Sequence, residues 1–388
     1  MAGVTDTAVE PPSLPVGSPE PAGQGWLATY RYPLTVFAAS RVAVYLLIAA
    51  ASWTSRSPRQ SGVSWHALFG ALGQWDVVWY RWIADHGYDP AIGHGNAAAF
   101  FPLYPLIWRP FSILPGPMEL WGSLLSTALF GGALCLLYRM TLGRYDEAIA
   151  RRTVLYLSIF PMTFVFSLPY AESLFLVLAL GAFALTWHGR WWWGCVAGAL
   201  AVLARPVGIA LLPALAWRRY RERGLAPAAY LPLLLLPAAE LAFFGYLYWR
   251  TGDPLAHFHA QKRGWGRGVS VLPVVLVKTI WDIFTGGQLR FIVHVVFTLL
   301  WCGLWYHAWR RLRLEAEYLI FAGLLILLPT AGGLIVSMGR FGMVAFPLFW
   351  SLASLGRDER VDTTVKVAFP LMLAALVFVT FGPRTFTP

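Results

Sequence analysis

The sequence predicts an all-α, polytopic transmembrane helical bundle. The chain has 388 residues, of which 58% are hydrophobic and only 13% are charged, so it lacks the polar surface that a soluble protein of this length needs. Several of its apolar runs approach the ~20 residues that cross the hydrocarbon core of a bilayer. Trp and Tyr lie near the ends of these runs, as they do at membrane interfaces.

Six apolar runs carry the clearest signal for spanning helices. They are residues 37–53, 120–138, 230–249, 291–309, 318–336 and 367–381. The first run begins beyond residue 30, after a segment rich in Pro, Gly and Ser, and we expect it to be retained as an anchor. Residues 1–30 are therefore predicted to be a disordered cytoplasmic tail, and residues 31–388 a single transmembrane domain.

The net charge of +11 is explained by membrane topology, and no nucleic-acid partner is expected. Basic residues cluster in short connectors between apolar runs, and such connectors stay in the cytoplasm. The basic connectors are residues 139–152, 188–190, 218–223, 310–313 and 356–366. With these inside, residues 55–119 and 250–288 become long outer loops, and the aromatic first loop is expected to form short interfacial helices.

Residues 191–217 decide the parity of this topology. A single span would place the next basic connector outside and would invert every later segment. A bend at Arg205–Pro206 divides the region into two short arms, because Pro interrupts a helix and Arg is costly at mid-bilayer. The two arms keep every basic connector inside and give about 11 spans.

The sequence predicts neither a metal site nor a cofactor. The three cysteines lie inside apolar runs, as small buried hydrophobes do. His257 and His259 are two residues apart, whereas helical side chains meet at spacings of three or four. No cysteine or close acidic pair completes a set of metal ligands around them.

The first polar motif, residues 74–88, opens the first outer loop. Asp76, Tyr80 and Ile83 fall on one face at helical spacing. A carboxylate beside an apolar surface and ringed by aromatics such as Trp75 suits a general base. The alternative is an interfacial helix that its aromatics anchor, with Asp76 as the N-cap.

Two further motifs combine aromatics with helix breaks. In Phe100-Phe101-Pro102-Leu103-Tyr104-Pro105, two prolines three residues apart prevent a regular helix. The result is either a structural turn or the wall of a lipid or sugar pocket. In residues 168–175, Tyr170 and Glu172 lie between apolar runs, and Glu172 either has a functional role or only begins the next helix, where its charge is favourable.

Three motifs place cations at the same outer side. Arg205 needs an anion there, either a phosphate or a partner carboxylate such as Glu172 or Asp76. Residues 251–267 end with Lys262, Arg263, Trp265 and Arg267, whose cations either hold an anionic head group or lie near lipid phosphates. Arg340 stands at another outer helix junction, where the alternative is an interfacial, snorkelling side chain.

These motifs resemble those of the PIG-V-type mannosyltransferases, which include the enzyme that adds the second mannose in glycosylphosphatidylinositol-anchor synthesis. The resemblance covers roughly residues 35–350. It comprises Trp75-Asp76 with Tyr80, Phe100 to Pro105, Pro169 to Phe175, Gly252-Asp253-Pro254 with Trp265-Gly266-Arg267, and Arg340-Phe341 with Phe346-Pro347. The chain departs from the family at Phe341, where Tyr is usual, and at Arg205-Pro206-Val207-Gly208.

The resemblance implies a bacterial member of the GT-C superfamily in the cell membrane. Such a glycosyltransferase uses a polyprenyl-phosphate sugar, here mannose, and works on the extracytoplasmic face. The absence of a Rossmann-like segment for a nucleotide sugar agrees with this. The acceptor would be lipid-linked, a polysaccharide or a protein.

The expected reaction is a single inverting displacement with Asp76 as the general base. Arg205, Arg340, Lys262 and Arg263 would bind the donor phosphate. The expected substrate pocket comprises Trp75, Tyr80, Phe101, Tyr104, Tyr170, Glu172, Trp265 and Arg267. The alternatives are a flippase or transporter of lipid-linked sugars, for which repeated halves with interrupted helices are typical, and a non-catalytic membrane assembly subunit.

Overall fold

The computed structural model describes residues 26–54, 65–89, 95–287 and 291–382, and every regular element in these ranges is helical. The α-helices are α1 (Trp26–Thr54), α2 (Trp65–Leu72), α3 (Asp76–His86), α4 (Leu103–Trp108), α5 (Met118–Leu142), α6 (Glu147–Ile159), α7 (Glu172–Trp187), α8 (Trp191–Ala204), α9 (Leu211–Arg223), α10 (Leu235–Thr251), α11 (Ala256–Trp265), α12 (Leu272–Gly286), α13 (Ile292–Arg310), α14 (Ala316–Ala331), α15 (Met338–Met343), α16 (Pro347–Leu355) and α17 (Glu359–Phe381). The 3₁₀ segments are η2 (Gly95–Ala99), η3 (Arg109–Ile113), η4 (Thr163–Ser167), η5 (Pro206–Ala210) and η6 (Pro227–Leu234). The predicted all-α fold class is confirmed.

Five stretches of helix are long and apolar enough to cross a membrane. They are Ala28–Thr54, Met118–Leu142, Pro227–Thr251, Ile292–Arg310 and Glu359–Phe381. Helices α7, α8 and α14 are also apolar but shorter, so the count of about 11 spans stays a prediction. Residues 1–25 of the predicted tail lie outside the described residues, and α1 already begins at Trp26.

The basic connectors meet at one end of the bundle, which we call the basic end. Ion pairs join Arg144 to Glu315, Arg357 to Asp146 and Arg221 to Glu317, and the Arg219 guanidinium stacks on the Trp191 ring. These contacts link the connectors that follow α5, α7, α9, α13 and α16. The charge pattern that the positive-inside rule uses is therefore concentrated on one side of the molecule.

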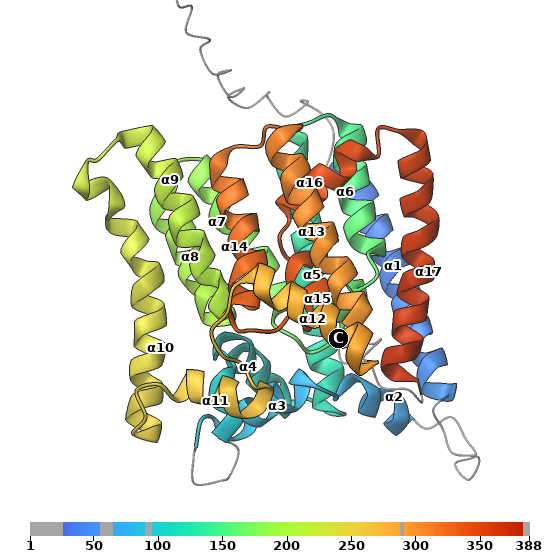
Figure 1. Ribbon diagram of the computed structural model, residues 1–388, viewed down its shortest axis with the longest axis vertical. Coiled ribbons are helices and arrows are strands. Elements are labelled where there is room, and N and C mark those ends of the chain that lie inside the picture. Colours follow the sequence, from blue (N-terminus) through green and yellow to red (C-terminus); the bar gives the residue numbers. More distant parts are fainter. Residues whose placement is uncertain (1–25, 55–64, 90–94, 288–290, 383–388) are drawn as a thin grey trace, which may run out of the picture.

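The opposite end, which we call the site end, carries the short helices of the outer loops. Figure 1 shows α2, α3, α4 and α11 together there. The His257 ring Nδ1 lies 3.1 Å from the Ala98 carbonyl, and the Gln261 amide donates to the Ala99 carbonyl at 3.2 Å. The two outer loops therefore pack on each other, and the first contains the short helices that its sequence predicts.

Exposed aromatic side chains form a belt at each end. At the basic end they are Trp192, Trp193, Trp217, Tyr306 and Trp309, and at the site end Trp53, Tyr248, Trp249 and Trp281. Amphipathic rings favour the level of the lipid head groups. We therefore expect the two membrane interfaces at these belts.

The chain turns back at Arg205–Pro206, as the parity argument predicts. Helix α8 ends at Ala204, Arg205 is extended with φ −154° and ψ 140°, and η5 then leads into α9. The start of α8 and the end of α9 meet at the basic end, where the Arg219 guanidinium lies over the Trp191 ring. Residues 191–223 are thus two arms whose bend lies at the site end.

The bend is closed by Gly208, which packs directly on α8. A Cβ at this position would lie 2.6 Å from the backbone of Ala201, which cannot move aside as a side chain does. We expect Gly208→Ala to cost about 1–3 kcal/mol of folding free energy through this overpacking. The measurement is the unfolding midpoint of the detergent-solubilised protein.

The matched control is Gly245→Ala on α10, where no atom lies within 4 Å of the added Cβ. Because Ala is the better helix former, this variant should equal or exceed the wild type in stability. Equal unfolding midpoints for the two variants would refute the role of Gly208 in closing the bend.

Candidate active site

A cavity of ≈ 1330 Å³ opens at the site end between the bundle and the outer-loop helices. Its wall is formed by α3, η2, the first residue of α7, the Arg205 bend, α10, α11, the segment after α11, and α13 to α15. The lining mixes charged side chains with an apolar surface that includes Phe101, Val207 and Leu334. A site of this kind can hold a ligand that is polar at one end and apolar at the other.

Four charged side chains form an alternating ion network in the cavity wall. The Arg340 guanidinium donates from Nη1 to Asp76 Oδ2 at 2.5 Å, and its Nε lies 3.2 Å from Glu172 Oε1. Glu172 also pairs with Arg205. The order is therefore Asp76, Arg340, Glu172, Arg205, and these residues come from four separate elements. Buried charges are tolerated when they are paired in this way.

Exposure separates the two carboxylates of the network. The Glu172 side chain is 2% exposed, whereas that of Asp76 is 19% exposed. Glu172 lies between two guanidinium groups and so holds both in place. Asp76 is held on one side by Arg340 and faces the cavity with the other. Glu172 is therefore enclosed between the two guanidinium groups, whereas part of the Asp76 carboxylate faces the cavity.

Helix ends fix these charges in favourable positions. Asp76 is the first residue of α3 and Glu172 is the first residue of α7, where the helix dipole favours a negative charge. Arg205 is the C-cap of α8, where the dipole favours a positive charge. The interpretation of Glu172 as the start of a helix is thus confirmed, and so is its pairing with Arg205. The interpretation of Asp76 as the N-cap is wrong, because the N-cap of α3 is Trp75 and Asp76 is the first residue of the helix.

Backbone strain borders the network on two sides. Trp75, directly before Asp76, has φ 55° and ψ −124°, and Ser337, three residues before Arg340, has φ 66°. Positive φ is unfavourable for residues with a side chain and is retained where the surroundings fix it. The Trp75 ring packs edge-on against Phe381 of α17 at 5.3 Å, which helps to hold the turn into α3.

Close packing on α13 positions Arg340. A Cβ at Gly339 would lie 2.7 Å from Phe297, and one at Gly342 would lie 2.2 Å from the Trp301 ring. The Trp301 indole also donates to the Met338 carbonyl at 2.8 Å. Helix α15 can therefore approach α13 closely only because glycines flank Arg340.

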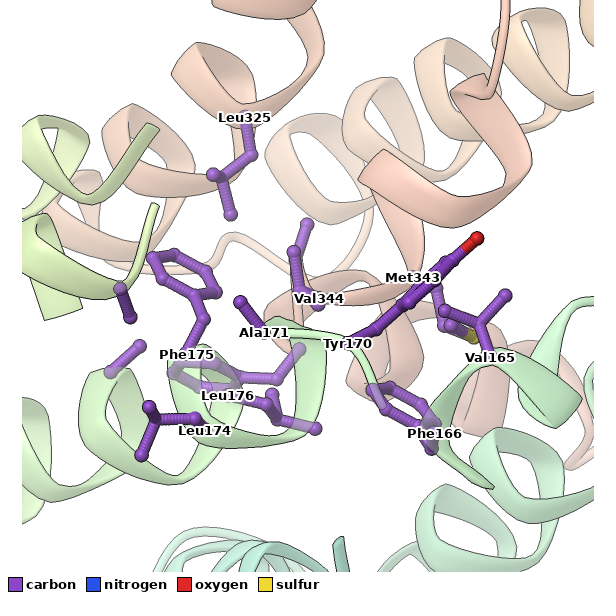
Figure 2. Close-up of a cluster of buried hydrophobic side chains, with 14 of the residues drawn as sticks. Val165, Phe166, Tyr170, Ala171, Leu174, Phe175, Leu176, Leu325, Met343 and Val344 are labelled. Carbon is purple, nitrogen blue, oxygen red and sulfur yellow. The ribbon is translucent and has the colours of Figure 1, made fainter. Parts of the chain in front are cut away.

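An apolar core packs beside the network. Figure 2 shows this cluster of buried side chains, which includes Leu174 and Phe175 of α7, Leu325 of α14, Met343 of α15 and Val344 directly after it. These residues are nearly or fully buried. Dense packing fixes the directions in which Glu172 and Arg340 leave their helices.

Aromatic rings build the outer wall of the cavity. The Tyr80 ring lies 5.2 Å from Phe100, and Phe100 lies 5.4 Å from Trp265. Burial raises the pKa of Tyr80 well above its usual value, so its hydroxyl stays protonated. Such rings offer faces for sugar or prenyl groups.

Most of the predicted site residues reach the cavity. The lining contains Asp76, Arg205, Arg340, Lys262, Trp75, Tyr80, Phe101, Glu172, Trp265 and Arg267. Three predicted residues are absent from it. Tyr170 lies beneath Arg340, 5.2 Å from its guanidinium carbon to the ring centre. Tyr104 is buried and donates to the Gly122 carbonyl at 2.9 Å, and Arg263 is exposed and donates to the Gly95 carbonyl at 3.3 Å.

Sequence reasoning missed Glu240 and His294, which also line the cavity. Glu240 is a lone carboxylate inside the apolar run of α10, and this is a signal that inspection of the run can find. His294 lies near the start of α13, and nothing in the sequence around it forms a motif.

No group of three or more His, Cys, Asp or Glu side chains is close enough to share a metal ion within the described ranges. Of the two neighbouring histidines, His259 pairs with Asp253 at 2.7 Å and His257 contacts a backbone carbonyl. Burial lowers the pKa of His257, so it is neutral at physiological pH.

No protein-family model and no curated protein matches the chain. Among solved structures, it is similar to the Archaeoglobus fulgidus oligosaccharyltransferase tethered to an acceptor peptide with an NVT sequon, at 15% identity and a TM-score of 0.47, over 94% of this chain and 56% of that one. It is also similar to archaeal oligosaccharyltransferase AglB from the same organism in complex with an inhibitory peptide and a dolichol-phosphate. The identity is 14% and the TM-score 0.49, over 94% of this chain and 57% of that one. This chain thus spans just over half the length of those proteins.

The network makes a testable prediction about stability. Glu172→Gln removes the carboxylate that two buried guanidinium groups share, and a broken buried pair costs about 3–5 kcal/mol. The unfolding midpoint of the purified protein should fall accordingly. The control is Glu222→Gln, which breaks the ion pair between Glu222 and Arg218. Because the Glu222 side chain is 36% exposed, this change should cost only about 0–1 kcal/mol. If both variants lose the same stability, Glu172 does not organise the site.

Proposed function

We propose that the chain is an integral membrane glycosyltransferase that transfers a mannosyl group from a polyprenyl-phosphate donor to an acceptor on the extracytoplasmic side. The motifs shared with PIG-V-type enzymes motivate the choice of sugar and donor. The observation that carries the proposal is a partly exposed carboxylate, Asp76, in the wall of a cavity that also holds several cations and a large apolar surface.

The reaction is an inverting displacement at the anomeric carbon. An acceptor hydroxyl oxygen forms the new bond to this carbon, and the bond from the carbon to the donor phosphate oxygen breaks. The bonding electrons leave with the polyprenyl phosphate. The hydroxyl proton passes to the Asp76 carboxylate, which acts as the general base. The contact with Arg340 keeps that carboxylate oriented.

Arg267 is the cation best placed to stabilise the leaving phosphate. Arg205 and Arg340 are already paired with carboxylates. Among the described residues, the Arg267 guanidinium makes a long hydrogen bond of 3.4 Å to the Pro329 carbonyl and lies over the Phe341 ring at 5.8 Å, but it has no carboxylate partner and its buried Nε has no hydrogen-bond partner. Burial and the neighbouring Arg340 lower the pKa of Arg267, so an anion beside it would be favourable. The paired arginines and Lys262 would add to the positive potential.

Arg267 lies on a segment that can adjust to a ligand. Gly266, with φ 63°, and Gly268 flank it. The segment is tied to the turn after α14, because the Gly268 and Ser270 amides donate to the Gly332 and Ala331 carbonyls, each at 2.9 Å. This anchoring would keep the guanidinium over the cavity while the glycines allow small movements.

The basic end and the site end set the expected orientation. The positive-inside rule places the basic connectors in the cytoplasm, so the cavity would open on the extracytoplasmic side of the cell membrane. The acceptor would then be a lipid-linked sugar, a polysaccharide or a protein of the cell envelope.

The direct test is incubation of the reconstituted protein with labelled polyprenyl-phosphate mannose and envelope glycolipids. A new glycosidic product supports the proposal. Movement of label across the bilayer without a new bond would instead establish a transporter. The reaction should continue in the presence of a chelator, and its loss there would overturn the expectation of a metal-free mechanism.

Asp76→Asn should lower the rate of transfer by about a hundredfold to ten-thousandfold, the usual contribution of a general base, while the protein stays folded and still binds the donor. The measurement is kcat in the reconstituted system. Asp85→Asn is the control, because Asp85 lies on the same helix and pairs with Arg81 at 2.7 Å. Near-normal transfer by the Asp76 variant would exclude it as the base.

Arg267→Gln should weaken donor binding about tenfold, since it removes a charged hydrogen-bond donor from the phosphate. The measurement is the Kd for polyprenyl phosphate. Arg109→Gln is the control, because Arg109 is exposed on η3 and is absent from the cavity lining. An unchanged Kd in the Arg267 variant would show that another cation binds the phosphate.

A further inference from the structure

Glu240 is an ionisable side chain deep within the membrane-spanning part of α10. It lies nine residues before Trp249, which is 75% exposed in the aromatic belt of the site end. A helical rise of 1.5 Å per residue places it about 14 Å below that interface, close to the middle of the hydrocarbon core. A carboxylate at this depth is costly unless it faces a cavity or a partner.

The side chain faces the bundle and contributes to the cavity wall. Leu236 and Phe243, four residues before and three residues after Glu240, are both buried, and these spacings place all three on one helical face. Glu240 lines the same cavity as Asp76, and so do Val207 and Ile209 of the Arg205 bend. The cavity therefore extends from the outer-loop helices to mid-membrane depth along α10.

The Glu240 carboxylate has no hydrogen bond or ion pair within the described part of the chain. In this it differs from Asp76 and Glu172, which are both held by arginines. An unpartnered acceptor group in a cavity wall is a site for a ligand that donates hydrogen bonds.

Charge and chemistry limit what this ligand can be. A carboxylate repels a phosphate, and a prenyl chain carries no hydrogen-bond donor, so of the groups in the proposed reaction only the hydroxyl groups of a sugar fit beside Glu240. We infer that Glu240 and the adjacent wall of η5 form a saccharide subsite, in which the carboxylate accepts hydrogen bonds from sugar hydroxyl groups. The inference rests on the proposed function for the choice of a saccharide as the ligand.

The test measures binding of labelled octyl α-mannoside and of polyprenyl phosphate to the full-length protein in lipid nanodiscs. Glu240→Leu should raise the Kd for the glycoside about tenfold, because a hydroxyl loses a charged acceptor. Glu240→Gln keeps an acceptor oxygen and should raise it only about threefold. Neither change should alter the Kd for polyprenyl phosphate. Leu241→Gln, on the 68% exposed neighbouring position, controls for polarity on α10 and for partitioning into lipid.

Each other result overturns the assignment. Wild-type protein that fails to bind the glycoside, or a Leu variant that binds it normally, removes the subsite. Equal losses in the Gln and Leu variants would show that the ligand needs the negative charge, as an amine does and a hydroxyl does not. A selective loss of polyprenyl phosphate would assign Glu240 to the phosphate or prenyl part of the donor instead of to a sugar. Absence of mannosyl transfer by the wild type would refute the proposed function, and the binding comparison would still decide the subsite.

Discussion

The need to compensate buried charge governs the site end of this protein. Glu172 lies almost fully buried between Arg205 and Arg340, and Arg340 reaches on to Asp76. None of these groups is stable alone at that depth, because the loss of hydration greatly exceeds the strength of a single ordinary hydrogen bond. The helices that carry them must therefore assemble together, and the network links the outer-loop helix α3 to three elements of the bundle.

The same network decides which charges remain available to a ligand. Paired guanidinium groups have much of their charge compensated, whereas Arg267 and Glu240 lack a counterion in the described part of the chain. The cavity therefore has an unpaired cation on one wall and an unpaired carboxylate on another. In a site of low dielectric, such fixed charges orient a polar ligand strongly. This separation provides the physical basis for assigning a phosphate to one wall and hydroxyl groups to the other.

Local backbone features make this arrangement possible. The glycines beside Arg340 let α15 approach α13, and Gly208 lets the Arg205 bend close on α8. Positive φ at Trp75 and Ser337 places the following helices at their required angles. The positive-φ residues are unfavourable on their own, and the glycines allow many conformations, so the packing around each of them selects the conformation that is observed. The membrane adds a further constraint, because every break in a helix must be satisfied within the protein.

The sequence by itself determined the helical fold class, the grouping of the basic connectors and the bend at Arg205–Pro206. It also identified Asp76, Glu172, Arg205 and Arg340 as candidate site residues. These follow from local composition, helix-breaking residues and the cost of charge in apolar runs. Only the tertiary structure decided the pairing, because Asp76 and Arg340 are 264 residues apart. It also placed Arg263 and Tyr104 away from the cavity lining and brought Glu240 into it. Which face of a helix meets a cavity depends on how helices that are distant in the sequence pack, and the local spacing of residues does not predict that packing.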